Sequence, residues 1–176
     1  FLPMSEVNLD YLIVRDADSR ILPREVEAVS AWKDSKNDFH IMRDHPGHVI
    51  LIPGGMFGVK GGVIKNIEQL IENWKLKRKK QNLGWADEYG LDQLFLAQII
   101  YPRIKDNVLI HTDLIKFSTE VVSSFPTIRI GNEFVGQVIT QEEGVQDNPI
   151  NLNQLNLKIY PNPKFYYDDK YIKLFN

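Results

Sequence analysis

Two carboxylates near the start of the sequence have the spacing of a metal site. Asp16 and Asp18 are separated by one residue and follow the apolar run 10–14 after a single arginine. Carboxylates at the end of a strand can turn toward one hard cation such as Mg²⁺ or Mn²⁺. Arg15 and Arg20 flank the pair and suit a site for a metal with an anionic ligand. The alternative is a solvated turn with an aspartate that caps the following helix.

The stretch 39–62 combines a polar loop with two glycine pairs. The glycine pairs, Gly54-Gly55 and Gly61-Gly62, would let the backbone approach a ligand closely, although hairpin turns explain them equally well. Their spacing matches neither the phosphate-binding loop nor the dinucleotide fingerprint. Paired loop histidines are commonly ordinary hydrogen-bonding residues. The polar loop contains Arg43, Asp44, His45 and His48.

Three further residues could contribute to the same chemistry. Asp92 suits the first turn of a helix, where it would cap the chain. Alternatively, it projects into a cleft as a general base or as an acceptor for a sugar hydroxyl, with Gln93 beside it. His111 ends a short apolar run, and it could complete an Asp, Asp, His coordination set with the first pair.

The elements that must position these residues alternate along the chain. Alternation of strands and helices indicates an α/β layered fold, in which ligands bind beyond the carboxyl ends of the strands. Pro102 is expected to end the last helix, and the basic run 75–80 is expected to be a solvated helix terminus. The pattern predicts strands at 10–14 (buried), 39–42, 49–52 and 108–110, and helices at 23–35, 63–80 and 92–100.

Composition limits the class of protein. The chain has 176 residues, no cysteine and a net charge of −2. The lack of cysteine excludes disulfides and thiolate metal sites. The slightly negative net charge argues against a protein whose main role is to coat nucleic acid. We expect a domain at 1–140 and an extension at 141–176. No apolar run is long enough to cross a bilayer, and no signal peptide is visible. These features predict a cytoplasmic protein. The cytoplasm of a virus-infected host cell is one location compatible with them.

Several motifs in fixed order resemble a known family. The segments YLIVRDADSRILPREVEAVSAW, FHIMRDHPGHVILIPGGMFGVK, YGLDQLFLAQIIYP and FPTIRIGNEFVGQ resemble the GT-A glycosyltransferase domain of chlorovirus-type and related bacterial sugar transferases. The similarity runs from about residue 10 to about residue 138. It implies an enzyme that moves a sugar from a nucleotide-diphosphate sugar to an acceptor hydroxyl. It also implies a metal, Mn²⁺ or Mg²⁺, held by Asp16, Asp18 and His111.

The resemblance also implies roles for the other candidates. Arg15 or Arg43 would compensate negative charge, and Gly54-Gly55 would let backbone groups reach the sugar. In an inverting reaction Asp92 would activate the acceptor; in a retaining one Asp92 or Gln93 would stabilise the oxocarbenium-like state. The substrate-binding set implied in this way is Arg15, Asp16, Arg43, Asp44, His45, Gly54 and Gly55.

One departure from the family pattern concerns the start of the chain. In GT-A domains a βαβ half that binds the nucleotide precedes the Asp-x-Asp strand, whereas only 15 residues precede Asp16 here. The start at Phe1 instead of methionine suggests processing or a piece of a longer protein. We therefore expect a mixed sheet flanked by helices without that half, with an exposed sheet edge. A missing N-terminal segment or a partner chain would complete it.

Two other functions are compatible with the same residues. One is a metal-dependent phosphoester hydrolase that uses the carboxylate pair. The other is a non-catalytic carbohydrate-binding or assembly module derived from a truncated transferase. The aromatic residues expected to make contacts in that module are Tyr160, Phe165, Tyr166, Tyr167 and Tyr171.

Overall fold

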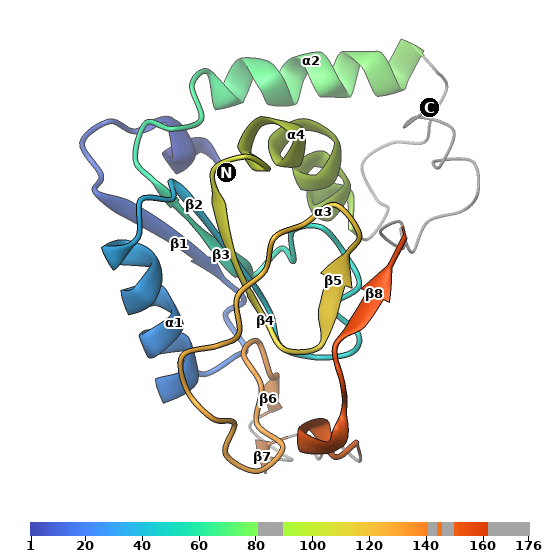
Figure 1. Cartoon of the computed structure of the whole chain (residues 1–176). Helices are drawn as coiled ribbons and strands as arrows, with labels where there is room; N and C mark the ends of the chain where they lie inside the picture. Colours follow the sequence, from blue (N-terminus) through green and yellow to red (C-terminus); the bar gives the residue numbers. More distant parts are fainter. Residues whose placement is uncertain (81–89, 141–143, 146–149, 162–176) are drawn as a thin grey trace.

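The computed structural model describes residues 1–80, 90–140, 144–145 and 150–161, which form a mixed α/β structure (Figure 1). Its centre is a four-stranded sheet in the order β1-β3-β2-β4. β3 is antiparallel to both of its neighbours, and β2 is parallel to β4. The strands are β1 (Tyr11–Arg15), β2 (Phe39–Arg43), β3 (Met56–Lys60) and β4 (Val108–Thr112).

The strand directions bring the polar segments to one edge of the sheet. β1, β2 and β4 run the same way, so their carboxyl ends meet the start of β3 at that edge. The Asp-x-Asp turn, the loop after β2 and the glycine pair before β3 therefore all lie on the same side. This is the edge beyond which ligands are expected to bind in a layered α/β fold.

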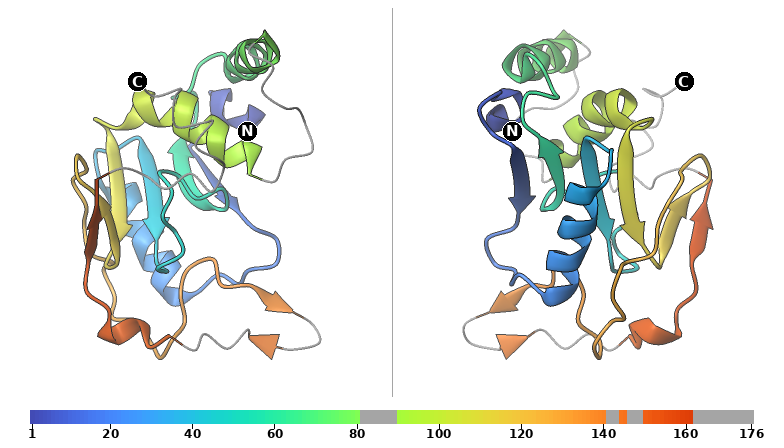
Figure 2. Two further views of the ribbon diagram at one scale, coloured as in Figure 1. Left: turned by 90° about the vertical axis from the view of Figure 1, so that its right-hand side faces the viewer. Right: turned by 60° about the vertical axis from the view of Figure 1, so that its left-hand side comes forward.

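Helix α1 (Pro23–Asp34) covers one face of the sheet (Figure 2). Its buried Ala28 and Trp32 belong to this side of the core, Ala28 in a small cluster with Met42 and Met56. The Trp32 ring lies directly on Gly58, where an added Cβ would stand 2.7 Å from the ring. The lack of a side chain at Gly58 in β3 thus allows α1 to pack closely on the sheet.

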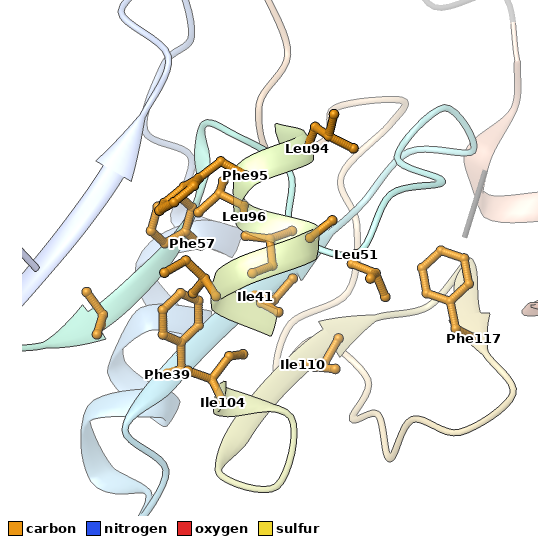
Figure 3. Close-up of a cluster of buried hydrophobic side chains, with 14 of the residues drawn as sticks. Phe39, Ile41, Leu51, Phe57, Leu94, Phe95, Leu96, Ile104, Ile110 and Phe117 are labelled. Atoms are coloured by element: carbon orange, nitrogen blue, oxygen red, sulfur yellow. The ribbon is translucent and has the colours of Figure 1, made fainter. Parts of the chain in front are cut away.

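The opposite face carries the larger apolar core (Figure 3). Phe39 and Phe57 stack there with ring centroids 5.4 Å apart, beneath a continuous helical run. That run consists of α3 (Leu91–Phe95), the π-helical turn η2 (Leu96–Ile100) and α4 (Tyr101–Ile104). Helix α2 (Ile67–Lys80) packs outside it through Trp74, whose ring meets Phe95 edge-on.

Two strand predictions are wrong in detail. Residues 49–52 are irregular, with bends at 50–52, although Val49, Leu51 and Ile52 are buried in the core. Their apolar character reflects core packing, and the strand comes later, as β3. β1 is an edge strand with half-buried side chains and an exposed Ile13, not a buried strand.

Two helix boundaries also differ from the prediction. Asn66 has a left-handed φ of 55°, so α2 begins at Ile67 and not at residue 63. Pro102 lies inside a helical run that continues to Ile104. The π-helical turn before it makes the i→i+5 bond from the Tyr101 amide to Leu96, which relieves the demand that a proline ring places on a regular α-helix.

The rest of the described chain wraps around this sheet. β5 (Ile115–Phe117) pairs in parallel with β8 (Lys158–Tyr160), so part of the predicted extension joins the body of the domain. β6 (Ile139–Thr140) and β7 (Gly144–Val145) pair antiparallel. Short 3₁₀ turns are η1 (Leu2–Ser5) and η3 (Leu152–Gln154). None of the helices in the described ranges combines the length and apolarity that crossing a membrane requires.

Candidate functional site

The structure forms a cavity of about 650 Å³ at the edge where the polar segments meet. Four segments that are distant in sequence contribute to its walls, namely the Asp-x-Asp turn, the glycine pair, the start of α3 and the strand-like stretch near residue 138. A concave site with a few converging polar groups is the usual form of a small-molecule site. Its lining residues are Asp16, Ala17, Asp18, Gly54, Gly55, Gly90, Asp92, Gln93 and Val138.

Six residues predicted from the sequence therefore come together in this cavity. Asp16 and Asp18 directly follow β1, as predicted. Asp92 lies in the first turn of α3, behind Gly90, which takes a left-handed φ of 85°. Gly90, and not Asp92, is the residue that caps this helix, and Asp92 lines the cavity. The other three predicted residues are Gly54, Gly55 and Gln93, which complete the set of six.

The glycine pair allows the two carboxylates to lie against the backbone. A Cβ added to Gly55 would stand 2.3 Å from Cγ of Asp16, and one added to Gly54 would stand 2.9 Å from Oδ2 of Asp92. Both distances are shorter than nonbonded contact allows. Adjacent glycines thus let Asp16 and Asp92 lie side by side. The pair also lies in a turn of the connection between the antiparallel strands β2 and β3.

The cavity carries negative charge that its own walls do not neutralise. Partial burial, followed by the charges of Asp18 and Asp92, raises the pKa of Asp16, and Arg15 only partly opposes this. None of the lining residues is a lysine or an arginine. Clustered carboxylates with a raised pKa favour a bound cation, and oxygen ligands suit Mg²⁺ or Mn²⁺. The donor set of Asp16 and Asp18 therefore fits a hard divalent ion.

His111 lies elsewhere. β1 and β4 are the two outer strands of the sheet, which places them three strand spacings, or about 14 Å, apart. The His111 side chain is buried, and its Nδ1 lies 2.8 Å from Nε2 of His40. Across the described residues, three or more histidine or acidic side chains do not gather around a common metal position. The structure thus does not bring His111 to the aspartate pair, against the expected three-ligand set.

Arg43 and Asp44 are both fully buried in ion pairs. Arg43 donates to both carboxylate oxygens of Glu120, at 2.7 and 2.8 Å. Asp44 accepts from Arg24 and Arg129 and from the Val135 amide. Their burial argues against the substrate-binding role expected for both, because their charges are already satisfied inside the protein.

Two other expected substrate-binding residues have their described contacts elsewhere. His45 packs against Phe134, with ring centroids 4.5 Å apart. The Arg15 guanidinium is bound to the Glu25 carboxylate and to backbone carbonyls after the Asp-x-Asp pair. Neither residue lines the cavity.

Sequence reasoning missed several residues that shape the site. Ser19 forms a bridge with Val138 and donates from Oγ to the Asp16 carbonyl at 3.0 Å. The only local signal for Glu25 is that it is an acidic residue in the first turn of a helix. The partners Glu120 and Arg129 have no local signal, because they come from irregular segments 77 and 85 residues away from Arg43 and Asp44.

The His40 and His111 pair is expected to make the protein less stable in acid. Burial is the main cause that lowers the pKa of His40 to about 3 and that of His111 to about 4, against 6.5 for an ordinary histidine. Below pH 6.5 the unfolded chain therefore takes up protons before the native state does. The free energy of unfolding should fall by up to about 1.4 kcal/mol per pH unit for each histidine.

Urea unfolding at pH 7.5, 6.5 and 5.5 measures this loss. In a His111→Gln variant one titrating group is gone, so the decrease between pH 6.5 and 5.5 should be shallower than in the wild type. Equal decreases in the two proteins would mean that His111 does not account for the acid sensitivity.

Comparison of this chain with protein-family models, curated proteins and solved structures gives no match. Inference about its function therefore rests on the residues and geometry of the cavity.

Proposed function

We propose that this chain is a glycosyltransferase that transfers a sugar from a nucleotide-diphosphate sugar to an acceptor hydroxyl. The observation that supports it is the convergence of Asp16, Asp18, Gly54-Gly55 and Asp92 in one cavity at the carboxyl edge of the sheet. These residues belong to three of the segments that resemble the GT-A domain, and no local pattern required them to meet.

In the proposed site Asp16 and Asp18 hold Mn²⁺ or Mg²⁺. The bound ion would supply Lewis-acid stabilisation of the diphosphate leaving group. The raised pKa of Asp16 supports this assignment, because a cation between the carboxylates would relieve their repulsion.

Asp92 and Gln93 would act on the sugar and the acceptor. The Asp92 carboxylate lies close enough to Asp16 to raise its pKa, and so stands next to the proposed cation site. There it can accept a proton from an acceptor hydroxyl, or stabilise positive charge on the sugar. Gln93 offers an amide for sugar hydroxyls, and the glycine pair presents backbone without side chains.

We also propose that the nucleoside part of the donor is bound at the outer edge of β1. β1 pairs only with β3 among the strands that the structure describes. The GT-A resemblance places the nucleotide-binding half beside this strand. A further segment of the protein or a partner chain would supply it.

Cation binding is the first test of this function. Mn²⁺ at 100 times its Kd should stabilise the protein by about 2.7 kcal/mol, which corresponds to a rise in Tm of roughly 5–10 °C for a chain of this size. Asp18→Ala should abolish the rise, because it removes one of two ligands. The measurement is thermal unfolding of both proteins with and without Mn²⁺; equal shifts would overturn the cation site.

Turnover of nucleotide sugars separates the alternatives. A transferase should release nucleoside diphosphate and pass the sugar to an acceptor, whereas a phosphoester hydrolase should cleave the donor equally well without one. Titration with uridine and guanosine diphosphates addresses the non-catalytic module. Nucleotide binding only by a version extended at its N-terminus would favour a piece of an enzyme. The aromatic residues assigned to that module, except Tyr160, lie outside the described residues.

A further inference from the structure

The Arg15 side chain braces the Asp-x-Asp turn from outside the cavity. Arg15 is the last residue of β1, and its Nη1 and Nη2 atoms donate to the carbonyls of Ser19 and Arg20 at 3.4 and 2.9 Å. These carbonyls belong to the two residues that follow Asp18. One side chain thus ties the start of the turn to its end.

Glu25 fixes the orientation of this arginine. Glu25 is 2 % exposed and lies in the first turn of α1. Both of its carboxylate oxygens accept from Arg15, one from Nε and the other from Nη2 at 2.7 Å. Paired charge-assisted bonds of this kind hold a guanidinium in a single plane. The packed helix therefore determines where the Arg15 donors point.

Apart from Arg15, the described contacts that hold the turn come from Ser19, which donates from its amide and its Oγ to the Asp16 carbonyl and forms a bridge with Val138. Asp16, Ala17 and Asp18 are exposed and belong to no helix or strand. Ligands that are already in place avoid the loss of conformational freedom that a loose loop suffers on binding. Support from β1 and α1, which are both rigid elements, meets this requirement.

We propose that Arg15 and Glu25 are positioning residues that hold Asp16 and Asp18 in the geometry that binds the cation. The cation in this inference rests on the proposed function, whereas the contacts that hold the turn do not depend on it. It replaces the expectation that Arg15 contacts substrate.

The test uses Glu25→Gln, with Glu27→Gln as the matched control, because Glu27 lies on the exposed side of the same helix. Loss of the charged bonds to Arg15 should weaken Mn²⁺ binding about tenfold, a typical effect for groups that orient metal ligands. Electron paramagnetic resonance of free Mn²⁺ measures the affinity. Excess Mn²⁺ should restore the transferase kcat of Glu25→Gln. A variant that is merely misfolded would not show this recovery. Unchanged Mn²⁺ affinity in Glu25→Gln would overturn the positioning role.

Trypsin provides a readout that is independent of the cation. The Arg20 carbonyl, which Arg15 holds, belongs to the peptide bond that trypsin cuts after Arg20, and Arg20 and Ile21 are both exposed. Cleavage there should be about tenfold faster in Glu25→Gln than in Glu27→Gln, the factor expected from the loss of about 1.4 kcal/mol of charged hydrogen bonding. Equal cleavage would contradict the bracing of the turn.

The two readouts separate the two proposals. Wild-type protein that shows no Mn²⁺ binding dependent on Asp18 would overturn the proposed function, while trypsin still decides whether the pair braces the turn. Arg15→Lys is the second variant in case Glu25→Gln does not fold. It keeps the charge but lacks the fork, and should show the same two effects.

Discussion

Replacement of Asp44 by asparagine is expected to lower the free energy of unfolding by about 3–5 kcal/mol, the usual cost of removing one partner from a buried ion pair. The Asp44 side chain is fully buried and lies between two arginines, with Arg24 at 3.0 and 3.1 Å and Arg129 at 2.6 Å. Without the Asp44 charge, the partly exposed Asp113 is the only acidic partner of Arg24 within the described chain. Arg129 then has no acidic partner among the described residues.

The location of Asp44 makes this effect matter for the cavity. Asp44 joins the end of β2, the start of α1 and the Val135 amide, which donates to its Oδ2 at 3.0 Å. The stretch that follows Val135 leads to Val138 in the cavity wall. Loss of Asp44 should therefore loosen the wall as well as the core.

Urea unfolding at neutral pH measures the loss, with Glu72→Gln as the control. Glu72 forms an exposed ion pair with Lys75, and its replacement should cost less than about 1 kcal/mol. A change below 1 kcal/mol in Asp44→Asn, with an unchanged m-value, would contradict the structural role of this carboxylate.

Gly55→Ala is expected to weaken Mn²⁺ binding strongly while leaving the fold intact. The new Cβ would stand 2.3 Å from both Cγ and Oδ2 of Asp16, so the carboxylate must leave its place. Asp16 is exposed and can turn away without disturbing the core. We expect Mn²⁺ affinity to fall by about 10- to 100-fold, the range seen when the groups around metal ligands are changed.

Gly54→Ala is the companion variant. Its Cβ would meet Asp92 at 2.9 Å and not Asp16, so it should impair turnover more than Mn²⁺ binding. Mn²⁺ titration and Tm are measured for both variants. Wild-type Mn²⁺ affinity in Gly55→Ala would show that Asp16 is not held as the structure places it, and a large drop in Tm would show that the glycine serves the fold instead.

Local properties of the sequence were sufficient for much of the site. An apolar β-branched run followed by Asp16 and Asp18 predicts a strand with carboxylates at its end, because side-chain type and spacing act over a few residues. The same holds for the amphipathic pattern of α2 and for Asp92 at a helix start. The cation binding and sugar transfer implied by the resemblance to the GT-A domain stay predictions, which the cation and turnover experiments test.

Only the tertiary structure decided which of these residues meet. β3 inserts between β1 and β2, which moves the glycine pair beside Asp16 and puts His111 on the far edge of the sheet. Arg43 and Asp44 became interior residues because Glu120 and Arg129 reach them from distant irregular segments. A charged residue looks the same in sequence whether it faces a substrate or a buried partner, since the free energy of burial depends on contacts that form only when the chain folds.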